Sequence, residues 1–432
     1  MLVLRRYGRG QRAHGPLAMQ LHFQTAPSEQ AFTDAADASH GSAVPGPLSF
    51  RLHERMEPLE TVWRALEAEN GLSLHQGYDW CRAWTESHGG RILVVEGVCA
   101  GRTHLLLPLG ITRLGPLRTA RLLASDFSNI NTGLHTPAFR SLAASGEFGK
   151  ALRQARGLLA RHFDLLLLDK VPLAWRGQQS PFSALAGLRN QNASFQLPIF
   201  ADFDETLAQL NAKRRRKKFR ASERRIAAVG GYEHIVAEPG AEAVALLETF
   251  FRQKAARFEA MGLPDAFRSE ETRNFFRALV AVPHTRETYP LRLHAVRLKG
   301  EHEGHIVAIA GMSRKGDHAI CQFGSIDETV AADASPGEML FFLIIRQLCE
   351  DGARLFDFGI GDQPYKRSWC TLETAQHDLF WAASTAGQAA AALHRMKTGA
   401  KRLIKQNAAV YSFVQRLRSG RQQPAPGDAE TE

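Results

Sequence analysis

The sequence contains little cysteine, and its cysteines show no pairing pattern. Its 432 residues include five cysteines, widely spaced and without a CxxC pair. This usage excludes a disulfide framework and a structural zinc site and is typical of a reducing compartment. We therefore expect a cytoplasmic protein without a metal site. No apolar run approaches the ~20 residues that a membrane-spanning helix needs, and the N-terminal MLVLRRYGRGQRAHG lacks the apolar core of a signal peptide.

Three common catalytic signatures are also missing. The chain has no GxSxG nucleophile elbow, no P-loop and no dinucleotide-binding GxGxxG. Their absence argues against serine hydrolases, Walker-type NTPases and common dehydrogenases. A hydrophobic content of 44% is ordinary for a globular protein. The length predicts two or three domains with ample core.

The net charge of +10 is concentrated in two segments. Lys213–Arg225 contains nine lysine or arginine residues and one glutamate, and Arg395–Arg421 contains eight and no acid. The rest of the chain is therefore slightly acidic. Such segments indicate two local basic surfaces and say nothing about the core.

The first basic segment has the pattern of a helix with one cationic stripe. At 100° per residue, the stripe consists of Lys213, Lys217, Arg220 and Arg224. Three interpretations stay open: a solvated helix face, a contact with a phosphate or acidic substrate, and sequence-independent binding of nucleic acid. Because Phe219 is the only aromatic residue among these cations, the third is the weakest.

The hydrophobic pattern divides the chain into four parts. Residues 1–45 lack periodicity and are expected to be disordered, and residues 386–432 are expected to form a basic helix and a disordered tail. In 46–195 the pattern predicts helices and strands at Leu59–Glu69, Tyr78–His88, Arg91–Val95, His104–Ile111, Phe148–His162 and Phe163–Asp169. In 196–385 it predicts them at Glu205–Val229, Ala241–Met261, Leu291–Leu298, His305–Ser313 and His318–Ile326.

The most informative segment is Ser335–Trp369. Ser335 is predicted to cap a helix, with Pro336 at its first position and Glu338 completing a capping box. Gly337 leaves the backbone bare, so that a ligand anion can approach the free N–H groups of the helix start. The buried helix is followed by a strand, Arg354–Phe358, and such a unit binds ligands at its strand ends. The alternative is a plain capping box on a core helix.

The strand and the loop that follows it carry Asp357, Asp362, Tyr365 and Lys366. These side chains can exchange protons with a substrate or bind it. A positioned acid or base accelerates a reaction by roughly 10²–10⁴. For Asp357 a structural role is equally open, either as a cap of the following loop or as a partner of Lys366 or Arg367.

Three segments together resemble a known family. ASPGEMLFFLIIRQLCEDGARLFDFGIGDQPYKRSW resembles the end of the CelD-like (BioF2-like) acetyltransferase domain of the GNAT superfamily. The basic helix LNAKRRRKKFRASERRIAAVGG is similar to the start of that domain, and LKGEHEGHIVAIAGMSRKGDHAICQFGSID to its central strands. The resemblance covers about residues 203–382. The first half, with YDWCRAW and LLLPLGITR, resembles the upstream part of such proteins, and the tandem halves are similar to Fem-type peptidyltransferases.

The resemblance implies an α/β (α+β) protein of two tandem GNAT-like domains, each a mixed twisted sheet flanked by helices. It also implies an acyl-CoA donor and direct attack of an amine on the thioester. The implied donor site consists of Gln322, Phe323, Gly324, Ser335, Pro336, Gly337, Glu338 and Met339. The strand residues would lie along the pantetheine, with a backbone N–H on the oxyanion, and the helix start would bind the pyrophosphate. Glu338 departs from this scheme, because it brings negative charge to an anion site unless its side chain turns back to the cap.

The acceptor would face the loop Asp357–Lys366. Asp357, Asp362 and Tyr365 are the candidate catalytic residues. The candidate substrate-binding residues are Lys213, Arg216, Arg220, Lys366 and Trp369. We expect an N-acyltransferase that acts on a small-molecule or glycan amine, with polysaccharide or cell-envelope metabolism as a context suggested by the family alone.

Two other functions stay open. One is a Fem-type transferase that uses aminoacyl-tRNA, with the basic helix on the RNA. The other is a non-catalytic GNAT-like module that binds an acidic polymer or a membrane surface. In the latter case Leu393, Met396, Leu403 and Ile404 of the C-terminal helix would form an interfacial contact.

Overall fold

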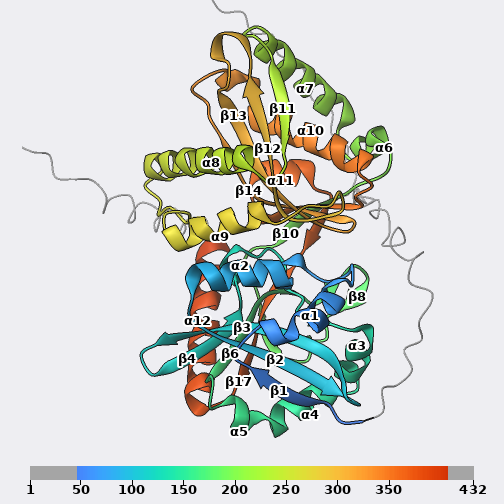
Figure 1. The fold of residues 1–432 in the computed structure, drawn as a ribbon, viewed down its shortest axis with the longest axis vertical. Helices are drawn as coiled ribbons and strands as arrows, with labels where there is room; N and C mark the ends of the chain where they lie inside the picture. Colours follow the sequence, from blue (N-terminus) through green and yellow to red (C-terminus); the bar gives the residue numbers. More distant parts are fainter. Residues whose placement is uncertain (1–45, 407–432) are drawn as a thin grey trace, which may run out of the picture. The chain divides into compact units, whose positions relative to one another are not determined.

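The computed structural model describes residues 46–406, which form two mixed β-sheets flanked by helices (Figure 1). The first sheet has eight strands. Its strand order is β1 (Ser49–His53), β2 (Arg91–Cys99), β3 (Arg102–Leu114), β4 (Leu117–Leu122), β6 (Leu165–Pro172), β17 (Gln376–Ala382) and β9 (Ala186–Arg189), with β5 (Leu134–His135) on β3. Only β4 and β6 pair in parallel in this sheet.

The second sheet has seven strands. They follow the order β11 (Tyr232–Ala237), β12 (Thr288–Leu298), β13 (Ile306–Lys315), β14 (His318–Ile326), β15 (Leu355–Ile360), β10 (Ser194–Pro198) and β16 (Leu372–Thr374). Here β14 and β15 form the single parallel pair. A small hairpin, β7 (Ala174–Trp175) and β8 (Gln178–Gln179), stands apart from both sheets.

Helices cover both faces of the second sheet. Along β12, Leu293 and Ala295 pack under α8 (Ala241–Ala260) and α9 (Glu270–Ala281), while Val296 and Leu298 pack under α10 (Pro336–Glu350). This period-two alternation is what a strand between two apolar layers requires. The other helices are α1 (Glu60–Glu67), α2 (Tyr78–His88), α3 (Pro137–Ala144), α4 (Glu147–Gln154), α5 (Arg156–Leu159), α6 (Phe203–Ala208), α7 (Ala212–Ala227), α11 (Pro364–Trp369) and α12 (Thr385–Gln406). The predicted fold class is thus confirmed.

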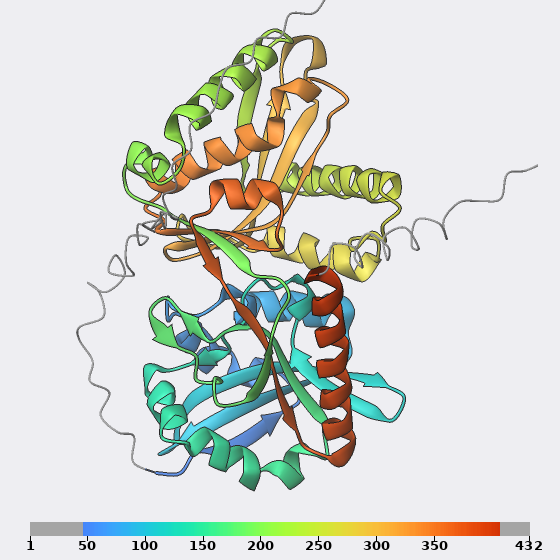
Figure 2. The same cartoon turned by 180° about the vertical axis from the view of Figure 1, so that it is seen from behind.

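One strand of the predicted second domain joins the first sheet. β10 lies at the predicted boundary near residue 195 and pairs with β15 and β16 of the second sheet. β17 falls inside the predicted second domain, 196–385, but pairs with β6 and β9 of the first sheet. In Figure 2 these two strands cross between the sheets. The two sheets therefore do not coincide with the predicted domains, whose boundaries lie at residues 195 and 385. The reason is that the C-terminal part of the chain returns to the first half.

The last described helix, α12, packs on β4, β6 and β17 of the first sheet (Figure 2, red). Gly387 permits the close approach, since a Cβ there would lie 1.8 Å from the Asp164 carbonyl oxygen. Leu393 and Met396 are exposed on this helix. Residues 1–45, which are expected to be disordered, lie outside the described residues. So do most of the basic tail and the side chains of Leu403 and Ile404. Between residues 46 and 406, no helix is long and apolar enough to cross a bilayer.

Two predicted helices are each divided in the structure. Glu205–Val229 is interrupted before Ala212, where Asn211 caps α7 by accepting the Arg214 N–H at 3.1 Å. Phe148–His162 is interrupted at Ala155 between α4 and α5. The Asn211 break follows from local capping chemistry, because asparagine is a strong N-cap residue. The prediction of one continuous helix was wrong at both places.

Asp164 joins β6 to β4 and to the start of α12. Its carboxylate accepts two bonds from the Arg118 guanidinium at 3.1 Å, one from the Arg118 backbone N–H at 2.9 Å, and one from the Ser384 hydroxyl at 2.9 Å. The Arg118 guanidinium, aided by the other two donors, lowers the pKa of Asp164 to about 2. This side chain is therefore charged throughout the neutral range.

We predict that Asp164→Asn lowers the free energy of unfolding at pH 7 by about 2 kcal/mol, because charge-assisted hydrogen bonds are lost. The folded pKa lies below the ordinary value of 3.8. The contribution of Asp164 is thus present above pH 3.8 and is lost as the pH falls towards 2. Urea unfolding should show a constant gap between the two proteins above about pH 5 that narrows below pH 4. Glu147→Gln, which removes an exposed pair with Lys150, should change stability by less than about 0.5 kcal/mol.

Candidate functional site

β14 and β15 run side by side over only three residue pairs. His318, Ala319 and Ile320 pair with Leu355, Phe356 and Asp357. β14 then continues along β13 to Ile326, while β15 continues along β10 to Ile360. The two parallel strands therefore separate after Ile320 and Asp357, with α10 as the connection between them. Ligands in open α/β sheets bind at such diverging carboxyl ends.

A β-bulge lies at this opening. Gly311 and Met312 of β13 pair with Phe323 and Cys321, which leaves Gln322 as the extra residue of β14. In a bulge the extra residue is left out of the hydrogen-bond ladder, and bulges are frequent beside active sites. Of the predicted residues, Gln322 and Gly324 are half-buried there. The Phe323 ring instead stacks on Phe250 in the core at 4.1 Å, so that only its backbone can face a ligand.

The start of α10 is not capped as predicted. Ser335 has left-handed backbone angles (φ 52°, ψ 57°), and its side chain caps no N–H. A side-chain cap needs an extended backbone at this residue, so the capping-box prediction was wrong. The Ser335 carbonyl accepts the N–H groups of Glu338 and Met339 at 3.1 and 3.2 Å. Of the predicted N–H donors, only those of Ser335 and Gly337 are without a partner among the described residues.

The Glu338 side chain turns to the basic helix rather than to the cap. Its carboxylate lies 2.6 Å from Arg215 Nη1 and 3.6 Å from Lys218 Nζ. The Arg215 guanidinium also covers the Trp369 ring at 3.7 Å and donates to the Ser368 carbonyl. Glu338 therefore brings no uncompensated negative charge to the helix start. Trp369 is 1% exposed beneath Arg215, which leaves it no surface for a substrate.

Asp357 is fully buried. One carboxylate oxygen accepts the Gly359 N–H at 2.6 Å, and the other accepts Gln196 Nε2 at 3.2 Å. Of the roles that the sequence left open for Asp357, the structure therefore shows the cap of the following loop. A side chain without exposed surface cannot take a proton from a bound amine in this conformation, so the catalytic role predicted for Asp357 has no geometric support.

The segment predicted to be a polar loop contains a short helix, α11. The Tyr365 ring stacks on Phe341 with centroids 5.8 Å apart. Tyr365 is 39% exposed, and its partial burial near the Cys321 and Cys370 thiols raises its pKa. Lys366 donates to the Ile360 carbonyl at 2.7 Å, and burial lowers its pKa. Both side chains interact electrostatically with Cys321 of β14.

Asp362, the third predicted catalytic residue, forms an ion pair with Arg367 on α11. Both line a small cavity of about 260 Å³ beside Phe195 of β10. Asp362 is exposed.

Eight of the nine cations of α7 fall into two groups. Arg215, Arg216, Lys218 and Arg225 form ion pairs with Glu338, Asp204, Glu338 and Asp333. The predicted stripe, Lys213, Lys217, Arg220 and Arg224, is exposed and has no ion pair within residues 46–406. Lys213 and Arg220 are therefore available to a ligand, whereas Arg216 already has a partner in Asp204.

Sequence reasoning missed His75, which reaches β14 from the first half. His75 is fully buried in the 3₁₀ turn η3 (Leu74–Gln76), with Nδ1 2.9 Å from the Ser73 hydroxyl and Nε2 3.0 Å from Gln322 Nε2. Burial lowers the pKa of His75 to about 4, so the ring is neutral. No local pattern could have indicated a contact between residues so far apart in the chain.

The comparisons with known proteins give one family match and several similar structures. Residues 213–367 match the family described as the acetyltransferase (GNAT) domain. Among solved structures, FemX is similar with a TM-score of 0.56 at 13% identity, over 79% of this chain and 99% of FemX. A tandem GNAT protein from the clavulanic acid biosynthesis pathway gives 0.43 at 14% identity, over 78% and 99%. The C-terminal domain of a putative lysylphosphatidylglycerol synthetase from Agrobacterium fabrum gives 0.43 at 12%, over 76% and 96%. No curated protein sequence matches the chain.

Residues 213–367 are a GNAT acetyltransferase domain of the CelD-like type, which confirms the resemblance seen in the sequence. The likeness to FemX shows that the tandem arrangement of the two halves is a known fold.

The Arg215–Glu338 pair gives a test of how the helix start is held. We predict that Arg215→Met lowers the free energy of unfolding by about 2–4 kcal/mol, because it leaves the partly buried Glu338 carboxylate with Lys218 alone. Lys213→Met removes an exposed cation of the same helix without an ion pair and should change stability by less than about 0.5 kcal/mol. Equal effects of the two substitutions in urea unfolding would show that the pair does not hold α7 to α10.

Proposed function

We propose that this protein is an N-acyltransferase that transfers an acyl group, such as acetyl, from acyl-CoA to an amine. One observation carries the proposal: within a GNAT domain, two parallel strands diverge at a bulge beside a helix start whose acidic residue is neutralised. We infer a cytoplasmic enzyme whose acceptor is a small-molecule or glycan amine.

The start of α10 suits the pyrophosphate of the donor. The N–H groups of Ser335 and Gly337 have no partner among the described residues, and a helix N-terminus attracts anions. Gly337 keeps this end bare, since a Cβ there would lie 2.9 Å from Ile326 Cγ2. With Glu338 paired to Arg215 and Lys218, the local charge does not oppose the phosphates.

The pantetheine and thioester would then lie along the separated part of β14. The acceptor nitrogen bonds to the thioester carbon, and backbone N–H groups at the Gln322 bulge would stabilise the oxyanion. A single such donor contributes about 3–4 kcal/mol. The carbon–sulfur bond then breaks, and the leaving thiolate takes a proton from the Tyr365 hydroxyl. The proton lost by the amine passes to solvent, from which Tyr365 is reprotonated.

We predict that acetyl-CoA binds to the protein in a calorimetric titration and that Gly337→Asp weakens binding at least tenfold. The matched variant Gly337→Ala adds the same Cβ without charge, so it should weaken binding less. Both variants should keep the wild-type circular dichroism spectrum. If millimolar acetyl-CoA shows no binding to the wild-type protein, the proposed donor is excluded.

For Tyr365→Phe we predict a loss of about 10²-fold or more in kcat with an unchanged Kd for acetyl-CoA, because only the proton donor is removed. The raised pKa of Tyr365 keeps the hydroxyl protonated above pH 10, the ordinary value for tyrosine. An acid must be protonated to act. The pH profile of the wild-type rate should therefore show no decline with an apparent pKa of 10 or below. A Tyr365→Phe variant that keeps the wild-type rate would exclude Tyr365 as the proton donor.

A second candidate is a Fem-type transferase that uses aminoacyl-tRNA. The unpaired stripe of α7 and the fold shared with FemX favour it. With four phosphate contacts, a plot of the logarithm of the tRNA-binding constant against the logarithm of the salt concentration would have a slope of roughly −3. A flat response of tRNA binding between about 50 and 200 mM salt would exclude this candidate. The non-catalytic module, with a peripheral membrane contact through the C-terminal helix, stays a prediction.

A further inference from the structure

Polar side chains of the first half form a buried network that reaches the second sheet. Its members, each at most 8% exposed, are Ser73, His75, Gln76, Asn131 and Thr132. The Ser73 N–H donates to Thr132 Oγ1 at 2.8 Å. Gln76 accepts the Thr132 N–H at 3.1 Å and donates to Asn131 Oδ1 at 2.7 Å. Because buried polar groups that are bonded to one another form a rigid unit, the turn η3 that carries His75 is fixed.

Both nitrogens of the His75 ring have partners. Nδ1 lies 2.9 Å from the Ser73 hydroxyl and 3.4 Å from the Ile130 carbonyl. Nε2 lies 3.0 Å from Gln322 Nε2 and 3.2 Å from Gln322 Oε1. The glutamine amide offers both an N–H and a carbonyl, so either tautomer of the neutral ring can bond to it. His75 thus links the network of the first half to the bulge of β14.

The Gln322 side chain is also held by β13. Gln322 Nε2 donates to Ser313 Oγ at 3.0 Å. The Ser313 hydroxyl donates its only proton to the Pro290 carbonyl, so towards Gln322 its oxygen can only accept. As the extra residue of the bulge, Gln322 is left out of the backbone ladder that fixes its neighbours. Its side-chain bonds to Ser313 and His75 therefore hold this part of β14.

The same part of the first half contacts the other strand of the opening. Asn129, which lies in the segment of the network residue Asn131, packs against Gly359 of β15. Gly359 has φ +77°, and a Cβ there would lie 2.9 Å from Asn129 Oδ1. Both contacts, at Gln322 and at Gly359, lie two residues beyond the last parallel pair of β14 and β15. One rigid part of the first half therefore supports both strands where they separate.

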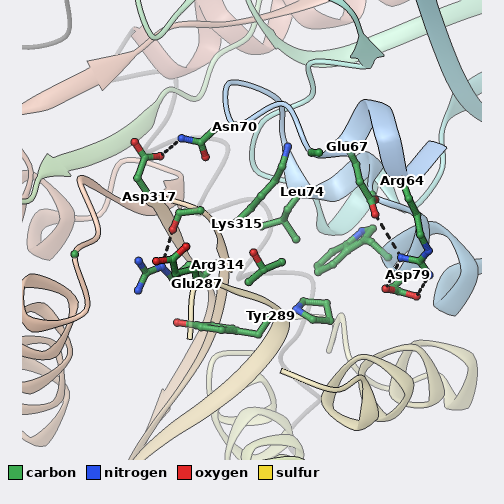
Figure 3. Close-up of a pocket in the computed structure, with 17 residues that line it drawn as sticks. Arg64, Glu67, Asn70, Leu74, Asp79, Glu287, Tyr289, Arg314, Lys315 and Asp317 are labelled. Carbon is green, nitrogen blue, oxygen red and sulfur yellow. Dashed lines mark hydrogen bonds and ion pairs between the residues drawn. The ribbon is translucent and has the colours of Figure 1, made fainter. Parts of the chain in front are cut away.

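The His75 ring is closed to a substrate in this conformation. Its neighbours Leu74 and Trp80 line a cavity of about 610 Å³, which Figure 3 shows, but His75 does not line it. The Trp80 ring stands edge-on to the His75 ring at 4.9 Å. A fully buried ring with partners at both nitrogens cannot exchange a proton with a bound molecule. His75 can therefore act on the reaction only through Gln322.

We propose that His75 is a positioning residue of the transferase, which fixes the bulge at Gln322 from the first half. It thereby places the backbone N–H groups that would stabilise the oxyanion. The role in the reaction rests on the proposed function, whereas the effect of His75 on β14 does not. Loss of this contact should loosen the bulge without removing a group that touches the donor or the acceptor.

Hydrogen–deuterium exchange of the protein without ligand tests the contact. In His75→Leu, peptides of β14 should exchange about tenfold faster, because Gln322 loses a buried hydrogen bond. The matched control is His135→Leu. His135 is also buried, with a pKa lowered by burial to about 4 as for His75, and its ring contacts Phe139 and Phe182 of the first half. It should leave the exchange of β14 unchanged, and similar exchange of β14 in both variants would overturn the proposal.

Two further variants test the contact even if His75→Leu does not fold. Gln322→Leu removes the same bond from β14 and should also raise its exchange about tenfold. His75→Gln keeps a side-chain amide that can bond to Gln322, so the exchange of β14 should stay within about threefold of the wild-type value. Unchanged exchange in Gln322→Leu, or exchange in His75→Gln as fast as in Gln322→Leu, would refute the contact.

Turnover tests the role in the reaction, measured as release of CoA from acetyl-CoA with glucosamine as the probe amine. His75→Leu and Gln322→Leu should each lower kcat about tenfold or more and leave the Kd of acetyl-CoA unchanged, because only the placement of the bulge is lost. The double variant should lose no more than either single variant, since both remove one contact. An unchanged kcat in His75→Leu, or an equal loss in His135→Leu, would refute the positioning role. A wild-type protein that neither binds nor cleaves acetyl-CoA would refute the proposed function, and the exchange experiment would still decide whether His75 fixes the bulge.

Discussion

The three-residue parallel pairing of β14 and β15 is the constraint on which the candidate site depends. Were the strands paired along their whole length, the sheet would be continuous and no ligand could enter it. β15 instead turns to β10, and β14 follows β13 with an extra residue at Gln322. Because α10 connects the two strands, its start necessarily lies beside the opening. The start of α10 and the separated part of β14 are therefore one structural unit.

The second half cannot be separated from the first without loss of this geometry. β17 leaves the second half to complete the first sheet, and His75 of the first half contacts Gln322 at the bulge. Arg176 and Asn70 hold Asp317 at the turn that begins β14. The first half thus acts as more than a second copy of the fold, because it supports the strand on which the proposed chemistry takes place.

Much of the fold could be predicted from the sequence. Helix α2 was predicted with its observed bounds, and the strands of the central hairpins were recovered because their alternation is local. The return of β17 to the first sheet was missed, since pairing partners far apart in sequence leave no local signal. The Ser335 capping box failed for a different reason: its side chains fit the pattern, but the left-handed backbone of Ser335 prevents the cap, and Arg215 takes Glu338 instead. The burial of Asp357 and Trp369 depends on tertiary packing and was likewise out of reach.

The central claim is that the acyl donor lies along β14 with its pyrophosphate at the start of α10. Hydrogen–deuterium exchange with and without acetyl-CoA tests it most directly, because it locates the ligand without assuming the chemistry. We predict slower exchange in peptides that cover residues 321–341, and no change in the peptides of α8, residues 241–260. Protection confined to other parts of the chain, or exchange in 321–341 that saturating acetyl-CoA does not alter, would contradict the account.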